Sequence, residues 1–211
     1  MVWGLLITFE GVEGSGKSTQ AELLKYYLES KGLEVVFSRE PGGTEIGERI
    51  RDILLDPVCR QMDARTELFL YLASRTQHVR EKILPALRAG KVVIVDRFAD
   101  SSVAYQGYGR ELREKFVARL NKLATGGLKP DLTILVDVPI GVGYQRKKGG
   151  KLDRMEQEEV QFHERVRNGY RRLARRAPGR IKIIPGDREP MEIQREARLL
   201  VDELLERKKK I

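Results

Sequence analysis

Residues 5–18 read LLITFEGVEGSGKS, an apolar run followed by a glycine-rich turn that ends in Lys17 and Ser18. The run at residues 5–9 predicts a buried β-strand, because near-continuous apolar segments are typical of parallel sheets that are covered on both faces. Residues 11–18 match the phosphate-loop pattern G-x-x-x-x-G-K-[ST] at every fixed position, between that strand and a predicted helix. The stretch therefore predicts a P-loop NTPase fold.

Four further apolar runs, at residues 33–37, 92–95, 132–136 and 181–184, also predict strands. Ala21, Leu24 and Leu28 recur at helical spacing, and Gly32 is placed to end that helix. Further helices are predicted at residues 67–87, 111–123 and 190–207. Strands that alternate with helices favour an α/β fold, here a five-stranded parallel sheet flanked by helices. We expect residues 1–211 to form a single domain, because no linker of domain scale interrupts them.

Composition and charge limit the partners that we expect. The chain has one cysteine, Cys59, which fits a reducing, cytoplasmic compartment. The apolar start lacks the features of an export signal, and no apolar run approaches the ~20 residues of a membrane helix. The net charge of +9 raises nucleic acid as a partner. However, residues 141–180 hold twelve Lys or Arg against five Asp or Glu, and a polyphosphate ligand explains that cluster. We therefore expect neither a membrane nor a nucleic-acid partner.

The phosphate loop predicts ATP and Mg²⁺ as ligands. Its glycines let backbone N–H groups converge on phosphate oxygens at a helix N-terminus. Lys17 is expected to reach the β- and γ-phosphates, and the Ser18 hydroxyl to ligate Mg²⁺. The predicted ATP-binding residues are Gly11, Val12, Glu13, Gly14, Ser15, Gly16, Lys17, Ser18 and Thr19.

The loop alone leaves the phosphate acceptor open among GTPases, motor ATPases and small-molecule kinases. The absence of an Asn-Lys-x-Asp motif in the sequence disfavours a GTPase, and the chain is too short for most motor modules. Further motifs narrow the choice: FEGVEGSGKSTQ at 9–20, REPGGT at 39–44, DRF at 96–98, Ser101 and Ser102, AYQG at 104–107 and LDRME at 152–156. Together they resemble thymidylate kinases over nearly the whole chain. The resemblance implies a homodimeric, cytoplasmic enzyme that converts dTMP and ATP to dTDP and ADP for dTTP supply.

Asp96 and Arg97 follow the apolar run at 92–95, so both emerge at the carboxyl end of a strand, where ligands of open α/β sheets bind. A structural ion pair is the alternative interpretation. The resemblance implies that Arg97 is catalytic and grips the acceptor phosphate, and that Asp96 positions Mg²⁺ through water. It also implies that Arg39, which follows the second strand, contacts the same phosphate. Two planar guanidinium groups suit one phosphate, because each holds two oxygens.

Tyr71 and Arg75 are four residues apart on the helix predicted at 67–87, hence on one face. A core position is the alternative for the aromatic ring. By resemblance, Tyr71 stacks on the thymine and Arg75 bonds its carbonyl edge. Ser102 matches a position that bonds the base N–H, and Tyr105 matches an aromatic that crowds the sugar 2′ position. Glu13 matches an acid that holds the 3′-hydroxyl.

The basic stretch RKKGGK, which begins at Arg146, resembles the lid of these enzymes. We expect a mobile lid at about residues 141–155 that closes over the ATP phosphates; a solvated charge run is the alternative. Some family members carry an arginine at the position of Gly14, and others supply that charge from the lid. This chain has Gly14, so a lid residue is expected to complete the site. Arg146 is the first choice, and the alternatives are Arg154, Lys147 and Lys148.

The remaining expectations concern the adenine, the histidines and rival functions. An adenine pocket is expected near Pro185, Gly186 and Asp187, after the last strand. His78 and His163 are expected to be structural or solvent-facing, because the ionised acceptor phosphate needs no general base. One rival is a kinase for another nucleoside monophosphate, such as deoxyguanylate or uridylate. The other is a non-catalytic nucleotide- or nucleic-acid-binding P-loop protein.

Overall fold

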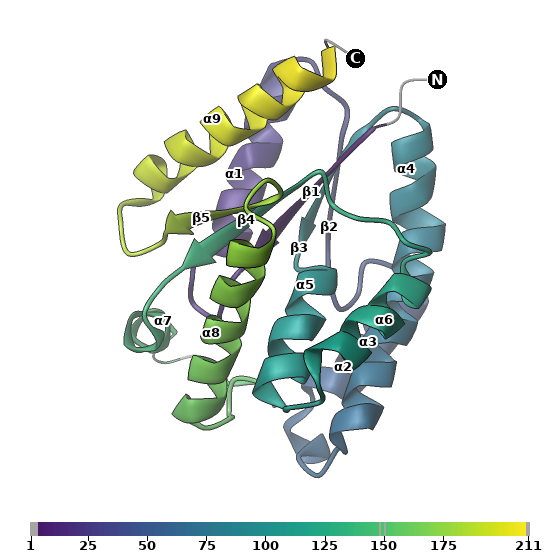
Figure 1. Ribbon diagram of the computed structural model, residues 1–211, viewed down its shortest axis with the longest axis vertical. Helices are drawn as coiled ribbons and strands as arrows, with labels where there is room; N and C mark the ends of the chain where they lie inside the picture. Colours follow the sequence, from purple (N-terminus) through teal and green to yellow (C-terminus); the bar gives the residue numbers. More distant parts are fainter. Residues whose placement is uncertain (1–3, 148, 150, 210–211) are drawn as a thin grey trace.

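The computed structural model describes residues 4–147, 149 and 151–209, and its centre is a five-stranded sheet (Figure 1). The strands lie in the order β2-β3-β1-β4-β5, and every neighbouring pair is parallel. Their bounds are β1 Leu5–Glu10, β2 Val35–Arg39, β3 Val92–Asp96, β4 Leu132–Asp137 and β5 Ile181–Pro185. The predicted α/β fold with a five-stranded parallel sheet is confirmed.

Successive residues of the strands face opposite layers of helices. In β1, Leu5, Ile7 and Phe9 belong to the core on one face, and Leu6 belongs to the core on the other. The strand is buried along its full length. It reads as a continuous apolar run because both of its faces are covered.

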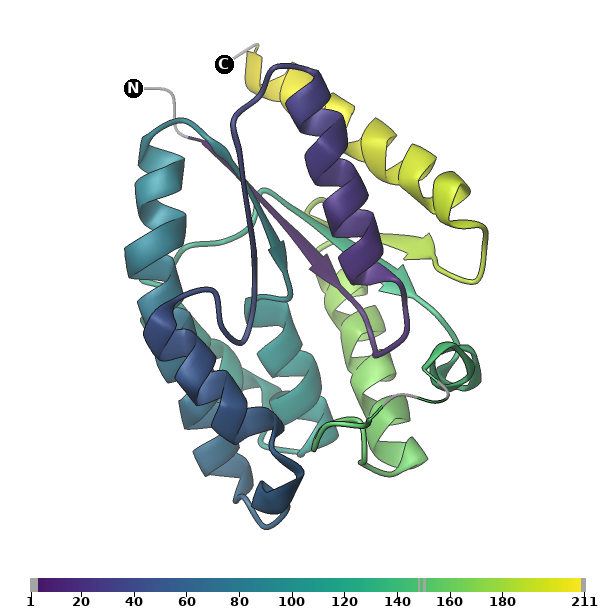
Figure 2. The ribbon, with the colours of Figure 1, turned by 180° about the vertical axis from the view of Figure 1, so that it is seen from behind.

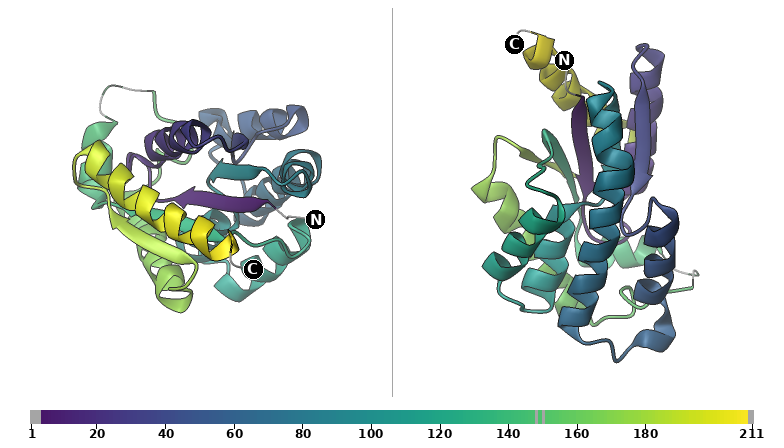
Figure 3. Two further views of the ribbon diagram at one scale, coloured as in Figure 1. Left: turned by 90° about the horizontal axis from the view of Figure 1, so that it is seen from above. Right: turned by 90° about the vertical axis from the view of Figure 1, so that its right-hand side faces the viewer.

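The helices form layers on the two faces of the sheet. Figure 2 shows α1 (Lys17–Ser30) and α9 (Pro190–Lys209) across one face, where they share a core with β1, β3 and β4. The other face packs against α8 (Val160–Arg176) and the helical run that ends in α4 (Leu84–Arg88), and Figure 3 shows the sheet between the layers. The remaining helices are α2 Glu45–Leu55, α3 Ala64–His78, α5 Ala99–Ser102, α6 Glu114–Ala124 and α7 Ile140–Arg146. Among the described residues, no helix is both long enough and apolar enough to pass through a membrane.

Several predicted elements are present with shifted bounds. The strand expected at 33–37 is β2, which continues to Arg39 because it pairs with β3 and places Arg39 opposite Asp96. The helix expected at 67–87 is part of a longer run in which the π-helical segment Val79–Ile83 joins α3 to α4. The helices expected at 111–123 and 190–207 are α6 and α9.

No bounds were predicted for the other helices. They are α2, α7, α8, and α5 with its π-helical extension Val103–Gly109; a 3-10 turn spans Pro57–Cys59. In α8, many arginines mask an apolar stripe of Phe162, Val166 and Tyr170 that contacts the sheet. In α2, the first turn is fixed by Thr44, whose side-chain oxygen accepts a 3.0 Å hydrogen bond from the Gly47 N–H.

Candidate active site

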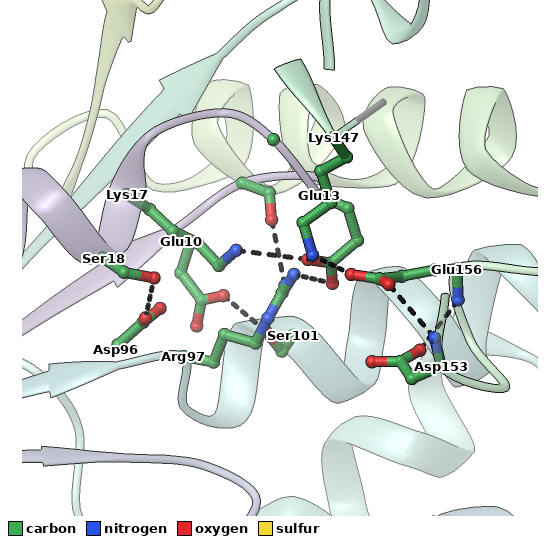
Figure 4. A network of polar contacts seen from close by, with 12 residues as sticks. Glu10, Glu13, Lys17, Ser18, Asp96, Arg97, Ser101, Lys147, Asp153 and Glu156 are labelled. Atoms are coloured by element: carbon green, nitrogen blue, oxygen red, sulfur yellow. Dashed lines mark hydrogen bonds and ion pairs between the residues drawn. The ribbon is translucent and has the colours of Figure 1, made fainter. Parts of the chain in front are cut away.

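A cavity of about 280 Å³ lies at the carboxyl edge of the sheet, where β2 and β3 end in Arg39 and Asp96. Its wall includes residues from α1, α2, α3, α5 and the segment 147–156, which are far apart in sequence. Figure 4 shows part of the polar network along this wall. The cavity brings together most of the predicted site residues: Glu13, Lys17, Ser18, Arg39, Tyr71, Arg75, Asp96, Arg97, Ser102 and Tyr105.

The phosphate loop connects β1 to α1 and presents Lys17 as the first residue of the helix. Lys17 is buried, and its Nζ lies 3.7 Å from Glu13 Oε2. Burial and the nearby positive charge of Arg97 lower the pKa of Lys17. The other predicted loop residues form the turn and the start of α1 and do not line this cavity: Gly11, Val12, Gly14, Ser15, Gly16 and Thr19.

Ser18 and Asp96 form a site with the donor chemistry of a magnesium ion. The Ser18 hydroxyl donates to Asp96 Oδ2. The other carboxylate oxygen, Asp96 Oδ1, is buried and has no hydrogen-bond partner among the described residues. Among all the described residues, no three or more His, Cys, Asp or Glu side chains are grouped in a way that suits a metal ion. Two oxygen donors fit Mg²⁺, which keeps several waters and binds phosphate oxygens.

Arg97 is held in a strained backbone conformation on the cavity wall. Its φ of 69° lies in the left-handed region, which is uncommon for residues other than glycine. Its guanidinium donates to the Gly11 carbonyl at 2.9 Å and to the Tyr105 hydroxyl at 3.0 Å. It also donates to the Glu13 carboxylate. These contacts fix the guanidinium beside the phosphate loop.

Glu13 is the anionic centre of the network in Figure 4. Besides Arg97, it faces Lys17 and Lys147, whose Nζ lies 3.8 Å from Glu13 Oε2. Burial alone would raise the pKa of Glu13, but these three cations lower it well below the usual range. The carboxylate therefore stays ionised at neutral pH.

Arg75 is 1% exposed, and the protein uses most of its hydrogen-bonding capacity. Nε donates to Glu40 at 2.7 Å, and Nη1 donates to Ser102 Oγ at 2.8 Å and to Asn121 Oδ1 at 2.6 Å. Nη2 donates to the Phe98 carbonyl at 3.0 Å. A guanidinium has five N–H groups, so one Nη2 N–H remains for a ligand in the cavity.

Two aromatic rings complete this end of the cavity. Tyr71 is half-buried on α3, and Tyr105 is buried with the Arg97 guanidinium 5.0 Å from its ring centroid. Tyr71 therefore lies on the cavity wall and not in the core, which was the alternative interpretation.

Glu10, at the end of β1, ties the phosphate loop to the start of α5. Its carboxyl accepts hydrogen bonds from the Phe98 N–H at 2.8 Å, the Ser101 hydroxyl at 2.6 Å and the Tyr170 hydroxyl at 2.9 Å. Burial and the neighbouring Asp100 raise the pKa of Glu10 to about 7. No role was predicted for Glu10 from the sequence.

The lid cations occupy different environments. Arg146 ends α7, is exposed and lies outside the cavity wall, with its Nη1 3.4 Å from the Gly14 carbonyl. Lys147 lies on the wall and contacts Glu156. Lys148 lies outside the described residues.

Arg154 is buried in a structural network. Its Nη1 lies 2.7 Å from Glu67 Oε2, and its Nε donates to the Leu54 carbonyl at 2.7 Å. Both Arg154 and Glu67 are almost fully buried. Arg154 therefore joins the end of the lid segment to α3 and the end of α2.

The phosphate loop and α7 meet backbone to backbone at two glycines. Gly14 has a φ of +69°, and a Cβ atom built on it would lie 2.2 Å from the Gly143 carbonyl oxygen. A Cβ atom on Gly143 would lie 2.4 Å from the Glu13 carbonyl oxygen. Side chains at either position would separate α7 from the loop. The loop of this chain therefore has no room for an arginine at position 14.

The expected adenine site and the histidines lie outside the main cavity. Pro185 ends β5, Asp187 is exposed, and Gly186 donates to the Asp137 carbonyl at 2.8 Å. A Cβ atom on Gly186 would lie 3.2 Å from the Ser15 carbonyl oxygen, so this turn adjoins the phosphate loop. The adenine pocket stays a prediction.

Both histidines are buried. His78 is 0% exposed and His163 is 3% exposed, so the structural interpretation holds and the solvent-facing one is wrong. Both helices carry polar faces, and that pattern did not reveal which face each histidine occupies.

Some wall residues had no predicted role. Arg51 of α2 lines the cavity and donates to the Pro41 carbonyl at 2.9 Å. Its helix was not predicted, so the residue had no assigned position. A signal was present, because Thr44 is a good N-cap directly after the REPGG loop. The other wall residues without a predicted role are Glu40, Pro41, Leu55, Ser101, Gln106, Asp153, Met155 and Glu156.

Comparisons with known proteins agree with this geometry. The sequence profile of the thymidylate kinase family matches residues 9–197. Thymidylate kinase from Symbiobacterium thermophilum is 47% identical over 204 residues, which cover 97% of this chain and 95% of that protein. The enzyme from Kosmotoga olearia is 52% identical over 183 residues, 86% and 88% of the two chains. A crystal structure of thymidylate kinase from Ehrlichia chaffeensis superposes with a TM-score of 0.78 at 34% identity, covering 95% of this chain and 99% of that one. The chain belongs to the thymidylate kinase family.

Proposed function

We propose that this protein is an ATP-dependent thymidylate kinase that transfers a phosphoryl group from ATP to dTMP and releases dTDP and ADP. One observation carries the proposal. A single cavity is lined by the phosphate-loop residue Lys17, by the strand-end arginines Arg39 and Arg97, and by Tyr71 and Arg75. A protein that only bound ATP would need no second set of arginines for an acceptor phosphate.

The proposed transfer needs charge neutralisation and alignment, not a general base. The acceptor monophosphate has a second pKa near ~6, so its attacking oxygen is ionised at neutral pH. Lys17 neutralises charge on the donor phosphates, and Arg97 and Arg39 hold the acceptor phosphate. We infer the same role for Arg51, because its guanidinium lies on the same wall as Arg39.

We assign the magnesium site to Ser18 and Asp96. Ser18 would ligate the ion directly, and Asp96 would hold it through water. The support is the unpartnered Asp96 Oδ1 beside the Ser18 hydroxyl. An ion held there would supply positive charge that neutralises part of the phosphate charge.

The residues at the far end of the cavity support a pyrimidine deoxynucleotide as the acceptor. The remaining Nη2 N–H of Arg75 can donate to a base carbonyl, and Tyr71 offers a ring face for stacking. Ser102 offers a hydroxyl to the base edge, and Tyr105 limits space near the sugar. Glu13 lies beside the Tyr105 hydroxyl, where it can accept from a 3′-hydroxyl.

The lid is part of the proposal. We assign residues 141–155 to a segment that closes over the ATP phosphates, with Arg146 bringing the missing charge. Its position at the end of α7, near the Gly14 carbonyl, supports this assignment. Arg154 is the weaker candidate, because it is buried and bonded to Glu67 and to the Leu54 carbonyl.

We also propose a homodimer in the cytoplasm. Ile46 and Ile53 of α2 and Phe69 of α3 are large apolar side chains that are about half exposed. The two helices pack against each other, so these side chains lie on neighbouring elements. A second copy of the chain would cover them.

A panel of nucleoside monophosphates, assayed with ATP and Mg²⁺, tests the acceptor. The expected order of kcat/KM is dTMP, then dUMP, then UMP far behind, with dGMP and dAMP near background. The thymine methyl contributes only ~1 kcal/mol, roughly fivefold, so dUMP should follow closely. A ribose hydroxyl buried beside Tyr105 without a partner should cost ~2–3 kcal/mol.

Two variants accompany the panel. Lys17→Ala should abolish turnover, whereas Lys25→Ala, on the exposed side of the same helix, should not. Tyr105→Ala should recover some UMP activity. If dGMP or UMP is the best acceptor, the thymidylate assignment is wrong. If Lys17→Ala retains a tenth of the turnover, the phosphate-loop mechanism is wrong.

A further inference from the structure

We infer that His78 is a positioning residue that orients Arg75 toward the acceptor base through the carboxylate of Glu40. The inference rests on the proposed role of Arg75 in binding that base. His78 does not line the cavity and cannot touch the substrate. Its contribution must therefore pass through other side chains.

The connection is a chain of hydrogen bonds inside the protein. Arg75 Nε donates to Glu40 Oε2 at 2.7 Å, and Glu40 Oε1 lies 3.0 Å from His78 Nδ1. His78 Nε2 lies 2.8 Å from Ser38 Oγ. Arg75 and His78 are three residues apart on α3 and so share a face. Glu40 and Ser38 come from the end of β2 and the loop that follows it.

The charges of the side chains decide which atom donates in each of these hydrogen bonds. The Glu40 carboxylate and the Arg75 guanidinium neutralise each other where both side chains are at most 2% exposed. A second positive charge on the fully buried His78 would have no counter-ion in this group, so the imidazole is neutral. A carboxylate only accepts, which assigns the proton to Nδ1. His78 then accepts from the Ser38 hydroxyl through Nε2.

The carboxylate of Glu40 thus has two donors, one on each oxygen, and cannot rotate without losing one. Glu40 is the only partner of Nε in Arg75 within the described structure, and this contact sets the plane of the guanidinium together with the contacts of Nη1 and Nη2. The plane in turn directs the one Nη2 N–H that remains for a ligand. Loss of the His78 contact would release Glu40 and let the guanidinium tilt. The effect should appear in acceptor recognition and not in ATP binding.

Two substitutions of similar shape test the two ring nitrogens of His78 separately. The amide of Asn lies near the position of Nδ1, and the amide of Gln near that of Nε2. His78→Asn should retain the donor to Glu40 and keep KM for dTMP within about threefold. His78→Gln should lose that donor and raise KM for dTMP roughly tenfold, because a buried hydrogen bond to a charged group is lost. KM for ATP should not change in either variant.

The preference for dTMP over dCMP is a second measurement, and it should not change if His78 only stabilises the fold. A 4-carbonyl accepts from the Arg75 N–H, whereas the 4-amino group of dCMP does not. His78→Gln should therefore lower the preference for dTMP over dCMP, measured as a ratio of kcat/KM, by roughly fivefold or more. Thr8→Val is the matched control, since it removes a buried 2.8 Å hydrogen bond to Thr133 outside the cavity wall. It should lower the melting temperature without changing the ratio.

The outcomes are distinct. A selective loss in His78→Gln, retained function in His78→Asn and a smaller loss in Ser38→Ala support the inference. Equal kinetics for the Asn and Gln variants overturn it, as does a lower melting temperature with unchanged KM and selectivity. Arg75→Gln distinguishes a failure of the positioning role of His78 from a failure of the proposed role of Arg75. If Arg75→Gln raises KM for dTMP and His78→Gln does not, only the positioning role of His78 fails. If Arg75→Gln does not raise KM for dTMP, the proposed role of Arg75 fails as well. Ser38→Ala carries the test if the His78 variants do not fold.

Discussion

Arg97 donates through its guanidinium to the carboxylate of Glu13, and both residues line the cavity. In a second arginine–glutamate pair, Arg39 also lines this cavity, whereas its partner Glu48 does not. The pairs differ in burial. Their side chains are 13% and 25% exposed in the first and 54% and 41% exposed in the second. The two pairs therefore allow a partly buried ion pair to be compared with a solvated one.

The first prediction uses this comparison. Glu13→Gln should lower kcat/KM for dTMP roughly 10- to 100-fold, because it leaves Arg97 and Lys17 without their counter-charge in a buried site. Glu48→Gln should change kcat/KM less than about fivefold, because exposed pairs contribute at most about 1 kcal/mol. Steady-state kinetics with dTMP varied at saturating ATP measure both. Similar losses in the two variants would contradict the assigned difference.

The second prediction separates Arg146 from Arg154. Arg146→Ala should lower kcat by roughly 10³-fold or more, because its proposed role is to stabilise the transition state, and should leave the melting temperature unchanged, because the side chain is exposed. Arg154→Ala should lower the free energy of unfolding by about 1–3 kcal/mol, because Glu67 loses one buried, charged hydrogen bond but keeps those from Arg110 and Gln106. Calorimetry and single-turnover kinetics give the two values. An Arg146→Ala enzyme with normal kcat would assign the charge to Lys147 or Lys148, which single variants then distinguish.

The third prediction concerns pH and Glu10. The pKa of Glu10 rises from its ordinary value of 4.5 to about 7 on folding. The folded protein therefore keeps a proton that the unfolded chain loses, and this stabilisation is full below about 4.5 and is lost as the pH rises through about 7. Glu10→Gln keeps a neutral side chain at every pH. Between about pH 5 and pH 8, the free energy of unfolding of the wild type should therefore fall by roughly 2–3 kcal/mol relative to that of Glu10→Gln.

Measurement of both proteins across that range isolates the contribution of Glu10, because the other carboxyls are common to both. Their effect has the opposite sign. The pKa values of Glu13 and Glu67 are lowered in the folded protein, so their contribution is lost as the pH falls. Parallel stability curves for wild type and Glu10→Gln would show that Glu10 titrates normally.

The fourth prediction concerns the dimer. Phe69→Glu should convert a particle of about 48 kDa, twice the 24.1 kDa of one chain, into a monomer in light scattering. The helical content should not change, since Phe69 is half exposed within one chain. Leu199→Glu, an exposed apolar position on α9, is the control and should leave the particle mass unchanged. A wild type that is already monomeric would contradict the prediction.

Much of the site could be predicted from the sequence because its residues follow strands. Lys17 comes after β1, Arg39 ends β2, and Asp96 and Arg97 come at the end of β3. The carboxyl ends of parallel strands meet at one edge of a sheet, so the apolar runs alone place these residues together. The resemblance then added residues that lie on helices, such as Tyr71.

The missed residues depend on partners that no local pattern reveals. Glu10 follows an apolar run like the other strand-end residues, but its role depends on Tyr170, which is 160 positions away. His78 lies in a helix with polar neighbours, and its buried contacts are with Ser38 and Glu40, which are about 40 positions away in sequence. Arg154 was considered as a free cation because its charge is visible in the sequence, whereas its pairing with Glu67 is not.

The backbone contact between Gly14 and Gly143 has a consequence for how such enzymes can diverge. A mutation that places arginine at position 14 would force α7 away from the loop before the new charge became useful. A mutation that enlarges position 143 would move α7, and Arg146 with it, while the loop still lacked a charge of its own. Each first step removes one source of the charge without establishing the other. Exchange between the two arrangements therefore requires coordinated changes at several positions, and a lineage that has adopted the glycine pair is constrained to retain it.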